Sequence, residues 1–406
     1  MRTITIGLLR ETKDPPDKRV PLTPLQCRQL LEQYPQLKIQ VQSSGYRCYA
    51  DDEYRAQHIP LAEDLSSCDM LMGVKEVKEE TLVPDKTYLF FSHTAKKQDY
   101  NRSLLQALVG KGIRMIDYEY LTGEDGVRVV AFGRWAGVVG AYNGLRAFGL
   151  KQAAHGFELK AAHECFNLEE LKEELQKVSL AQTRILLTGG GRVAGGALEI
   201  LDEIGIRKVS PGAFLQKEMD HPVYTRLDPW HYTRRRDEED FSFGHFVNHP
   251  ESYENAIQPY LRKAHIFMAC HFWDPRSPVM LTREDLASGD LPLSVIADIS
   301  CDINGPIAST IRASTIADPF YGYDASTGNE AGAFEKDALT VMAVDNLPGE
   351  LPRDASADFG KALMEHVIPE LIGKTESSML ERATISRNGQ LGPEYSYLSD
   401  FLKGLE

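Results

Sequence analysis

A glycine-rich turn near the middle of the chain has the residue types and spacing of a phosphate-binding loop. The stretch RILLTGGGRVAGGALEILDEIG places Gly189, Gly191 and Ala194 in the pattern G-x-G-x-x-G/A. An apolar run precedes the turn and a helical pattern follows it, as in dinucleotide-binding units. The glycines allow a tight turn and a close approach to a pyrophosphate, whose charge the helix N-terminus stabilises. We therefore favour a nicotinamide dinucleotide site over an ordinary strand–helix turn.

The residue that would distinguish NAD from NADP is not evident. An acidic side chain at the end of the second strand normally binds the ribose 2′-hydroxyl, and IRKVSPGAFLQ contains none. Ser210 would not repel a 2′-phosphate, and Arg207 or Arg226 would attract one. The sequence therefore does not distinguish NAD from NADP.

Two residues in the first third of the chain have side chains suited to proton transfer. Lys75 lies in the apolar segment MLMGVKEV, where an unpaired ammonium group costs free energy. It either reaches solvent from the end of a strand or serves a chemical purpose. His93 ends the segment TYLFFSH, a place where a histidine considered alone is more often structural.

Strands alternating with helices must position these residues. In the first third, the strands TITIGLL, LKIQVQSS, MLMGVKEV and TYLFFSHTA alternate with the helices PLTPLQCRQLLEQY and SLLQALVGKG. This order predicts a mostly parallel sheet covered by helices. The segment IRMIDYEYLTGEDGVRVVAFG predicts two strands joined at Glu124-Asp125-Gly126.

A second α/β unit begins with the strand at Arg184, after long helices within 134–178. Between its strands lies the polar stretch 216–250, which includes RRRDEED and which we interpret as an insertion with weak local structure. Helical periodicity returns after Phe320, most clearly in SADFGKALMEHVIPELI. The unit's other predicted elements are a helix over 193–204 and strands over 266–272 and 294–300.

Composition narrows the class of protein. The 406 residues have room for two to three domains, and 42% hydrophobic with 26% charged residues is typical of a globular protein that folds in water. No run approaches 18 apolar residues, and MRTITIGLLRETK predicts a strand rather than a signal peptide. The net charge of −14 argues against a nucleic-acid surface. Six scattered cysteines without a C-x-x-C pair favour reduced thiols over disulfides or zinc. We expect a cytoplasmic protein that acts on small molecules and holds no metal. The sequence does not determine its oligomeric state.

Several motifs together resemble the alanine dehydrogenase/saccharopine dehydrogenase superfamily. They are ETKDPPDKRVPLTP, GVKEVKEE, FSHTAKKQ and the glycine turn. Three further stretches are similar to the lysine-forming saccharopine dehydrogenases and, more closely, to the lysine–2-oxoglutarate reductase half of bifunctional lysine-degrading enzymes. These are FGRWAGVVGA, ADISCDINGPIASTIRASTIADPFYGYD and AVDNLPGELPRDAS.

The resemblance implies an α/β fold of two Rossmann-like domains with parallel sheets, the cofactor domain being inserted into a discontinuous catalytic domain. Residues 1–145 and 331–406 would form the catalytic domain. Residues 146–330 would form the NAD(P)-binding domain, including the insertion at about 216–250. The active site would lie in the cleft between the domains.

The resemblance also implies roles for individual residues. Lys75 would be the general base and His93 its acid partner, with Glu76 and Glu119 tuning their pKa values. Contacts with substrate would come from Arg19, Gln98, Arg128, Phe132 and Asp302. The cofactor would be held by the glycine turn and by a segment that contacts its nicotinamide end: Gly189, Gly191, Arg192, Val193, Ala194, Val344, Asp345, Asn346 and Leu347.

The chemistry of saccharopine suits these residue types. Its oxidation needs a hydride acceptor, proton-transfer groups for an amine and for water, and cations for several carboxylates. A nicotinamide, a lysine–histidine pair and arginines would supply them. Two alternatives stay open. An alanine dehydrogenase shares the Arg, Lys and His positions, although Gln98, Arg128 and the VDNLP motif count against it. A catalytically silent NAD(P)-binding sensor would not need the Lys75–His93 pair.

Overall fold

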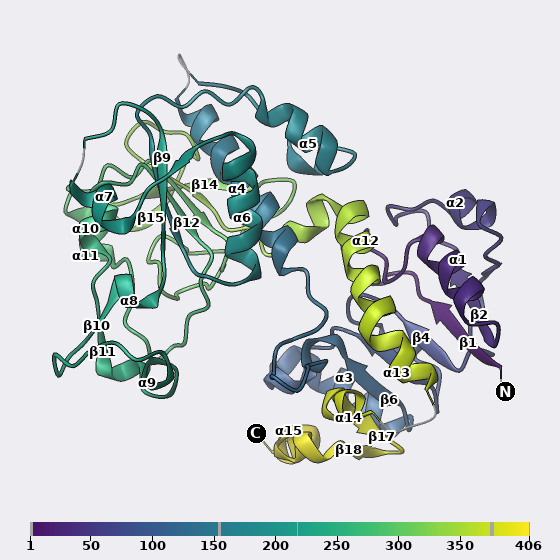
Figure 1. Cartoon of the computed structure of the whole chain (residues 1–406). Coiled ribbons are helices and arrows are strands. Elements are labelled where there is room, and N and C mark those ends of the chain that lie inside the picture. Colours follow the sequence, from purple (N-terminus) through teal and green to yellow (C-terminus); the bar gives the residue numbers. More distant parts are fainter. Residues whose placement is uncertain (1–2, 153–155, 217, 374–376, 406) are drawn as a thin grey trace. The chain divides into compact units, whose positions relative to one another are not determined.

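The computed structural model describes residues 3–152, 156–216, 218–373 and 377–405, which divide into two compact units (Figure 1). Unit 1 contains the chain up to Phe132 and again from Pro352 to the C-terminus. Unit 2 contains Gly133–Leu351. The chain therefore leaves unit 1 once and returns to it once, at positions that differ from the expected 145 and 330.

Unit 1 is built on an eight-stranded sheet with the order β18-β17-β6-β5-β4-β1-β2-β3. The six strands from the N-terminal segment are parallel, and the two from the C-terminal segment extend one edge in the antiparallel sense. The parallel strands are β1 (Ile4–Leu8), β2 (Leu37–Gln42), β3 (Leu61–Ala62), β4 (Met70–Met72), β5 (Thr87–Phe90) and β6 (Arg114–Asp117); the others are β17 (Thr384–Arg387) and β18 (Gln390–Leu391).

The first of the helices of unit 1 begins at a capping box. Thr23 accepts a hydrogen bond from the amide of Gln26, whose side chain bonds back to Thr23 N, and Pro24 occupies the first helical position. The helices are α1 (Pro24–Gln33), α2 (Asp51–Ala56), α3 (Arg102–Gly110), α12 (Pro352–Ala362), α13 (Ile368–Ile372), α14 (Ser378–Ala383) and α15 (Ser399–Lys403), with a π-helical turn at Leu363–Val367 joining α12 to α13.

Two strand predictions in unit 1 need correction. Strand β4 ends at Met72, so Lys75 lies in the following loop rather than in the strand. The second strand expected after Asp125 is reduced to a single antiparallel bridge between Thr122 and Arg128, because the amide of Gly123 bonds locally to Val127. Both segments leave the sheet where their backbone amides bond to a side chain or within a local turn instead of to a neighbouring strand.

Unit 2 is built on a second eight-stranded sheet, with the order β15-β14-β16-β13-β12-β7-β9-β8. Its strands are parallel except for β14 and β15, which are antiparallel at one edge. Two α/β units with mostly parallel sheets confirm the predicted fold class. The strands are β7 (Arg184–Thr188), β8 (Arg207–Lys208), β9 (Val223–Leu227), β12 (Ile266–Ala269), β13 (Val295–Asp298), β14 (Phe320–Asp324), β15 (Asn329–Ala331) and β16 (Leu339–Met342).

The remaining elements of unit 2 surround this sheet. A small antiparallel ribbon joins β10 to β11. Its members and the helices are β10 (Thr233–Arg235), β11 (Tyr253–Asn255), α4 (Gly133–Lys151), α5 (Leu168–Leu175), α6 (Arg192–Glu203), α7 (Pro211–Gln216), α8 (Pro229–Tyr232), α9 (Phe243–Asn248), α10 (Gln258–Leu261) and α11 (Arg283–Ala287).

The interpretation of 216–250 as a weakly structured insertion is wrong for part of its length. Strand β9 lies inside that range and pairs along its whole length with β7, from Arg184↔Val223 to Thr188↔Leu227. Its side chains are buried at Val223, Tyr224 and Leu227 because both faces of an inner strand are covered. The next part of the range forms α8, β10 and α9.

Helix α4 belongs to unit 2 because it packs against α6 at very short range. A Cβ atom at Gly137 would lie 1.9 Å from Val193 O, and one at Gly196 would lie 1.9 Å from Arg134 O. Only glycine allows this backbone approach, so the two helices are fixed together. The chain therefore enters unit 2 at Gly133, earlier than the expected boundary near 145.

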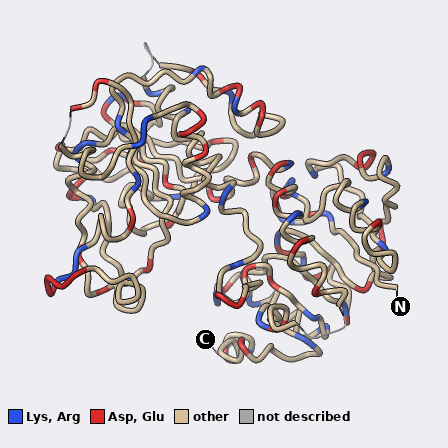
Figure 2. Tube along the Cα trace, in the orientation of Figure 1, with Lys and Arg blue, Asp and Glu red and all other residues tan. Residues whose placement is uncertain are grey.

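Charged residues and thiols are scattered along the chain, apart from the charge block RRRDEED at 234–240. Acidic and basic residues are interspersed along both units (Figure 2). All six cysteines are free thiols. Within the described ranges, no helix is long and apolar enough to cross a membrane, and no group of three or more His, Cys, Asp or Glu side chains is arranged to hold a metal ion.

Candidate functional site

The candidate proton-transfer residues of unit 1 follow neighbouring parallel strands. Lys75 follows β4, His93 follows β5 and Glu119 follows β6. These strands are adjacent in the sheet, so their carboxyl ends share one edge, where open α/β sheets bind ligands.

His93 and Glu76 form a close pair. His93 Nδ1 lies 2.6 Å from Glu76 Oε1, and Lys13 Nζ lies 3.3 Å from Glu76 Oε2. Burial raises the pKa of Glu76, but the hydrogen bond and charge of His93, with further contributions, outweigh it and lower the pKa to about 2. Glu76 therefore orients the imidazole ring through Nδ1, and the contact does not involve Nε2. His93 has a positive φ of 53°, an uncommon backbone conformation for this residue type that clusters at functional sites.

Lys75 is held by a residue that was not predicted, Glu11. The Glu11 carboxyl accepts hydrogen bonds from Val74 N at 2.7 Å and Lys75 N at 2.9 Å. Burial raises the pKa of Glu11 to about 8. Burial, followed by the charge of Arg19, lowers the pKa of Lys75. Glu11 stands in the ETKDPPDKRVPLTP motif, but only the fold brings it to the backbone of Lys75.

Asp117, which was also not predicted, anchors the histidine loop. It ends β6, is fully buried and accepts hydrogen bonds from Ser92 N at 2.9 Å and Ser92 Oγ at 2.6 Å. It also accepts one from Glu119 N at 2.8 Å. Burial raises its pKa despite these bonds. Asp117 thereby fixes the residue that precedes His93 and the start of the Glu119 segment.

The two arginines expected to bind substrate differ in accessibility. Arg19 has only 3% of its side chain exposed and makes a bidentate pair with Asp17, at 2.9 Å and 2.6 Å. Its guanidinium lies over the Phe132 ring, 4.2 Å from the ring centre. Arg128 has 39% of its side chain exposed and bonds to Glu119 at 3.1 Å. Arg128 is therefore the more accessible cation for a carboxylate.

An aromatic cluster supports Arg19 and His93. Phe132 stacks on Phe359 with ring centres 4.4 Å apart, and Phe91 lies 6.1 Å from both rings. Phe91 also stacks with His93 at 6.5 Å. Phe359 comes from α12, so the C-terminal segment completes the base of the site in unit 1. Gln98 is at the exposed rim, where its Oε1 accepts a hydrogen bond from Tyr100.

The glycine turn in unit 2 has the geometry that its pattern predicts. It joins β7 to α6, a twelve-residue helix that starts after Gly191. Gly189 has φ of 98°, and a Cβ atom there would lie 2.6 Å from Cys270 O. At Gly191, by contrast, no heavy atom of the described chain lies within 4 Å of such a Cβ. The helix N-terminus therefore faces open space that fits a pyrophosphate.

The acidic residue missing from the sequence interpretation is Asp228. Strand β9, rather than β8, lies beside β7, and Asp228 directly follows β9. Asp228 Oδ1 would lie 3.0 Å from a Cβ atom at Gly190, and Oδ2 accepts a hydrogen bond from Arg226 at 2.8 Å. An acidic side chain at the end of the second strand, next to the glycine turn, is in the position that contacts the cofactor ribose.

His271 was also not predicted. It follows β12, is 6% exposed, and its Nδ1 lies 2.7 Å from Thr188 Oγ1, directly before the glycine turn. Burial lowers its pKa to about 4, so the ring is neutral near pH 7. His271 is 83 residues from Thr188 along the chain, so no local sequence pattern indicated this contact.

The other expected ligand residues of unit 2 lie on loops after adjacent strands. Asp302 follows β13, and burial, followed by the charge of Asp298, raises its pKa. Asp345 is exposed in the turn after β16, and Val344 and Leu347 beside it are buried. These loops share the edge at which the glycine turn leaves β7. Arg192 is exposed at the start of α6, whereas Ala194 is buried.

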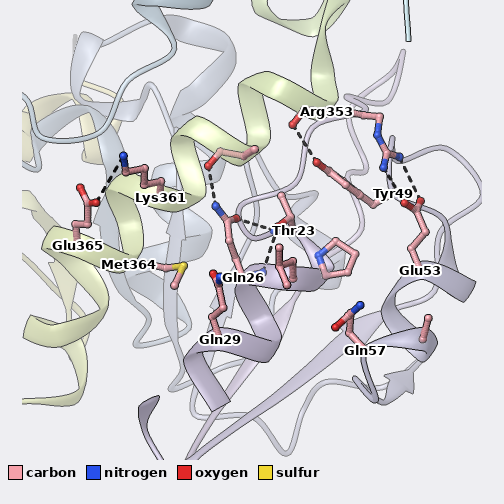
Figure 3. A pocket seen from close by; sticks show the side chains of 14 residues that line it. Thr23, Gln26, Gln29, Tyr49, Glu53, Gln57, Arg353, Lys361, Met364 and Glu365 are labelled. Atoms are coloured by element: carbon pink, nitrogen blue, oxygen red, sulfur yellow. Dashed lines mark hydrogen bonds and ion pairs between the residues drawn. The ribbon is translucent and has the colours of Figure 1, made fainter. Parts of the chain in front are cut away.

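One large cavity of unit 1 is lined by other residues. It has a volume of about 780 Å³ and lies against α1, α2 and α12 (Figure 3). None of the candidate proton-transfer residues lines it. Its charged residues pair with one another, Arg353 with Glu53 at 2.7 Å and Lys361 with Glu365 at 3.9 Å. Size alone therefore does not identify the reacting centre.

Comparison with known families agrees with the two-unit architecture. The chain matches the alanine dehydrogenase/PNT N-terminal domain over residues 7–139 and the alanine dehydrogenase/PNT C-terminal domain over residues 230–391.

Curated relatives cover nearly the whole chain. It is 29% identical to alpha-aminoadipic semialdehyde synthase of Arabidopsis thaliana, over 97% of this chain and 41% of the relative. It is 30% identical to the mitochondrial alpha-aminoadipic semialdehyde synthase of Bos taurus, over 99% of this chain and 48% of the relative. The chain thus spans less than half of each synthase. It is 28% identical to saccharopine dehydrogenase (NAD(+), L-lysine-forming) of Emericella nidulans, over 89% of this chain and 91% of the relative.

Solved structures share the fold. An L-alanine dehydrogenase superposes with a TM-score of 0.67 at 15% identity, over 98% of this chain and all of the other. The transhydrogenase from Sinorhizobium meliloti superposes with a TM-score of 0.62 at 14% identity, over 95% and 99%.

Proposed function

We propose that this chain, which belongs to the alanine dehydrogenase/PNT family of oxidoreductases, interconverts saccharopine with lysine and 2-oxoglutarate, using a nicotinamide cofactor. The observation that carries the proposal is the grouping of Lys75, the His93–Glu76 pair and Arg128 at one sheet edge of unit 1. The name of the Emericella nidulans relative, a saccharopine dehydrogenase that aligns over 89% of this chain, supports the same substrate.

The residues of unit 1 supply the proton transfers. Neutral Lys75 accepts a proton from the bridging nitrogen of saccharopine, and its lowered pKa increases the neutral fraction near pH 7. Once the carbon bound to this nitrogen is at the imine oxidation level, water adds to it. His93, oriented by Glu76, then donates a proton to the lysine nitrogen as the carbon–nitrogen bond breaks and the added oxygen becomes the carbonyl of 2-oxoglutarate. Arg128 binds a substrate carboxylate, and Arg19 adds positive potential over the aromatic cluster.

The residues of unit 2 fit a nicotinamide dinucleotide. When bound, the nicotinamide supplies the hydride acceptor or donor. The backbone at Gly189 and Gly191 would hold the pyrophosphate, and the loop with Val344, Asp345, Asn346 and Leu347 would lie toward the nicotinamide end. We infer a preference for NAD over NADP, because Asp228 would accept hydrogen bonds from ribose hydroxyls and repel a 2′-phosphate. The NAD(+) in the name of the Emericella nidulans relative supports this choice.

A substrate comparison tests the proposal. Oxidation of NADH by the purified chain is measured with lysine plus 2-oxoglutarate, and separately with pyruvate plus ammonium. We expect turnover with the first pair and higher kcat/KM with NADH than with NADPH. Faster oxidation with pyruvate and ammonium would indicate an alanine dehydrogenase. Cofactor binding without turnover of either pair would indicate a sensor.

A further inference from the structure

Two arginines, Arg207 and Arg226, were left by the sequence as candidates for contact with a cofactor 2′-phosphate, and the fold separates them. Strand β9 ends at Leu227, whose carbonyl accepts a hydrogen bond from Gly189 N in the glycine turn. Arg226 is therefore one residue from the end of β9 that meets the turn. Arg207 pairs instead with Val223, at the other end of β9. Four residues of an extended strand span about 13 Å, so only Arg226 of these two arginines lies beside the turn.

Arg226 and Asp228 both reach the central residue of the glycine turn. A Cβ atom at Gly190 would lie 3.0 Å from Asp228 Oδ1 and 3.9 Å from Arg226 Nη1. The two side chains also form an ion pair, in which Arg226 Nη2 donates a hydrogen bond to Asp228 Oδ2 at 2.8 Å. The side chain of Arg226 is 30% exposed and that of Asp228 is 13% exposed. A ligand at the turn therefore meets an accessible cation as well as the carboxylate that is paired with it.

The two charges of this ion pair favour different cofactors. A carboxylate beside the turn accepts hydrogen bonds from the ribose hydroxyls of NAD and repels the 2′-phosphate of NADP. A guanidinium binds a phosphate through paired hydrogen bonds. Because Asp228 already binds Nη2 of Arg226, it competes with a phosphate for the guanidinium. The carboxylate thus disfavours NADP in two ways, by direct repulsion and by holding the arginine.

We propose that Arg226 is a specificity-determining residue of the cofactor site, a 2′-phosphate-binding arginine that its ion pair with Asp228 keeps engaged. The inference rests on the proposed function and refines its choice of cofactor. With Asp228 ionised and paired, the chain selects NAD. Without that charge, Arg226 binds the 2′-phosphate and the chain accepts NADP. A purely structural ion pair that fixes the end of β9 would give Arg226 no part in binding either cofactor.

Calorimetric titration with NADH and NADPH tests the proposal without any turnover. The quantity compared is the dissociation constant of NADPH divided by that of NADH. Asp228→Asn keeps the shape of the side chain and removes its charge, so we expect this ratio to fall roughly 10- to 100-fold, the range of a hydrogen bond to a charged group. Adding Arg226→Met to that variant should raise the ratio again by at least about tenfold. Adding Arg207→Met, which removes an exposed arginine at the far end of β9, is the matched control and should leave the ratio as in Asp228→Asn.

The variants keep the proposal falsifiable. Arg226→Met with Asp228→Asn removes both members of the ion pair, so neither charge is left unpaired, and circular dichroism checks that each variant is folded. If that variant does not fold, Arg226→Lys with Asp228→Asn carries the test, because it keeps the charge without the planar fork and should raise the ratio by a smaller factor.

The outcomes separate this proposal from the proposed function. Equal ratios in Asp228→Asn with and without the substitution of Arg226 would overturn the role of Arg226, as would an equal rise in the Arg207 control. A wild-type preference for NADPH would overturn the cofactor choice of the proposed function, and the two double variants would still decide the role of Arg226. Absence of binding of either nucleotide to the wild type would overturn both.

Discussion

At the residue scale, the candidate site depends on carboxyl groups that hold the backbone beside the candidate proton-transfer side chains. Glu11 binds the amides of Val74 and Lys75, and Asp117 binds the amide and hydroxyl of Ser92 next to His93. Glu76 then orients the imidazole through a 2.6 Å contact. Each candidate proton-transfer group is thus held by a second residue, which limits its motion.

Substituting the proton-transfer residues should reduce turnover far more than cofactor binding. Lys75→Met and His93→Gln keep approximate size and remove the group that exchanges protons. We expect kcat to fall about 100- to 10,000-fold in each, the usual contribution of general acid–base catalysis. If the two residues act as a pair, the double variant loses less than the sum of the single losses in free energy.

The pH profile separates this role from a structural one. Activity that needs neutral Lys75 rises with pH through the pKa of that group, and a lowered pKa moves the rise to lower pH. The rising limb should disappear in Lys75→Met, while Lys38→Met, at an exposed position on β2, keeps the wild-type profile. Wild-type rates and profiles in both single variants would place the chemistry at other residues.

At the element scale, the N-terminus of α6 is the part of unit 2 that must remain accessible to the pyrophosphate of the proposed cofactor. Gly189 packs against the backbone of Cys270, and Gly196 packs against that of Arg134, so both contacts fix α6 in place. Gly191 makes no such contact and faces the space expected for the pyrophosphate. The same helix therefore contains glycines needed for packing and a glycine available to a ligand.

Gly191→Asp should abolish cofactor binding and leave the fold intact. The added side chain has room in the protein, but its carboxylate would occupy and repel the position of the pyrophosphate. Gly212→Asp is a matched control, because Gly212 in α7 is also exposed, with no described heavy atom within 4 Å of a Cβ. Calorimetric titration with NADH is expected to show no binding to the first variant and wild-type affinity in the control. Equal affinities in all three proteins would mean that the turn does not hold the cofactor.

At the scale of the whole molecule, each unit contains a buried titratable group, and the two groups have opposite effects on how stability changes with pH. Glu11 in unit 1 has a pKa raised from 4.5 to about 8, and His271 in unit 2 has one lowered from 6.5 to about 4. Glu11, whose pKa is raised, stabilises the fold below about pH 4.5, and this stability is lost as pH rises through 8. His271, whose pKa is lowered, stabilises the fold above about pH 6.5, and this stability is lost as pH falls through 4.

Two substitutions separate these contributions. Relative to wild type, Glu11→Gln should flatten the loss of unfolding free energy between about pH 4.5 and 8. His271→Gln should flatten the loss between about pH 6.5 and 4. Urea denaturation across this range measures both slopes, and an exposed-site variant, Glu80→Gln, controls for removing a carboxylate. Unchanged slopes in the two buried-site variants would show that neither group titrates as its burial implies.

The sequence by itself determined those features that depend on the spacing of neighbouring residues. Alternating strand and helix patterns gave two α/β units, and the G-x-G-x-x-A pattern gave the strand–turn–helix now seen at Gly189–Ala194, because turn geometry depends on neighbouring residues. Lys75 and His93 were found beside strand ends for the same reason, although the extent of β4 was overestimated.

Only the tertiary structure decided which distant segments meet. Strand β9 takes its place beside β7 through parallel pairing, and this is what identifies Asp228 as the acidic residue near the glycine turn. Glu11 reaches Lys75 from 64 residues away, and Asp117 reaches Ser92 from 25. Parallel strands are joined by long crossovers, so hydrogen bonds at their carboxyl ends link residues with no fixed spacing along the chain. For that physical reason Lys75 and His93 could be named as candidates from sequence motifs, whereas the residues that hold them in position could not.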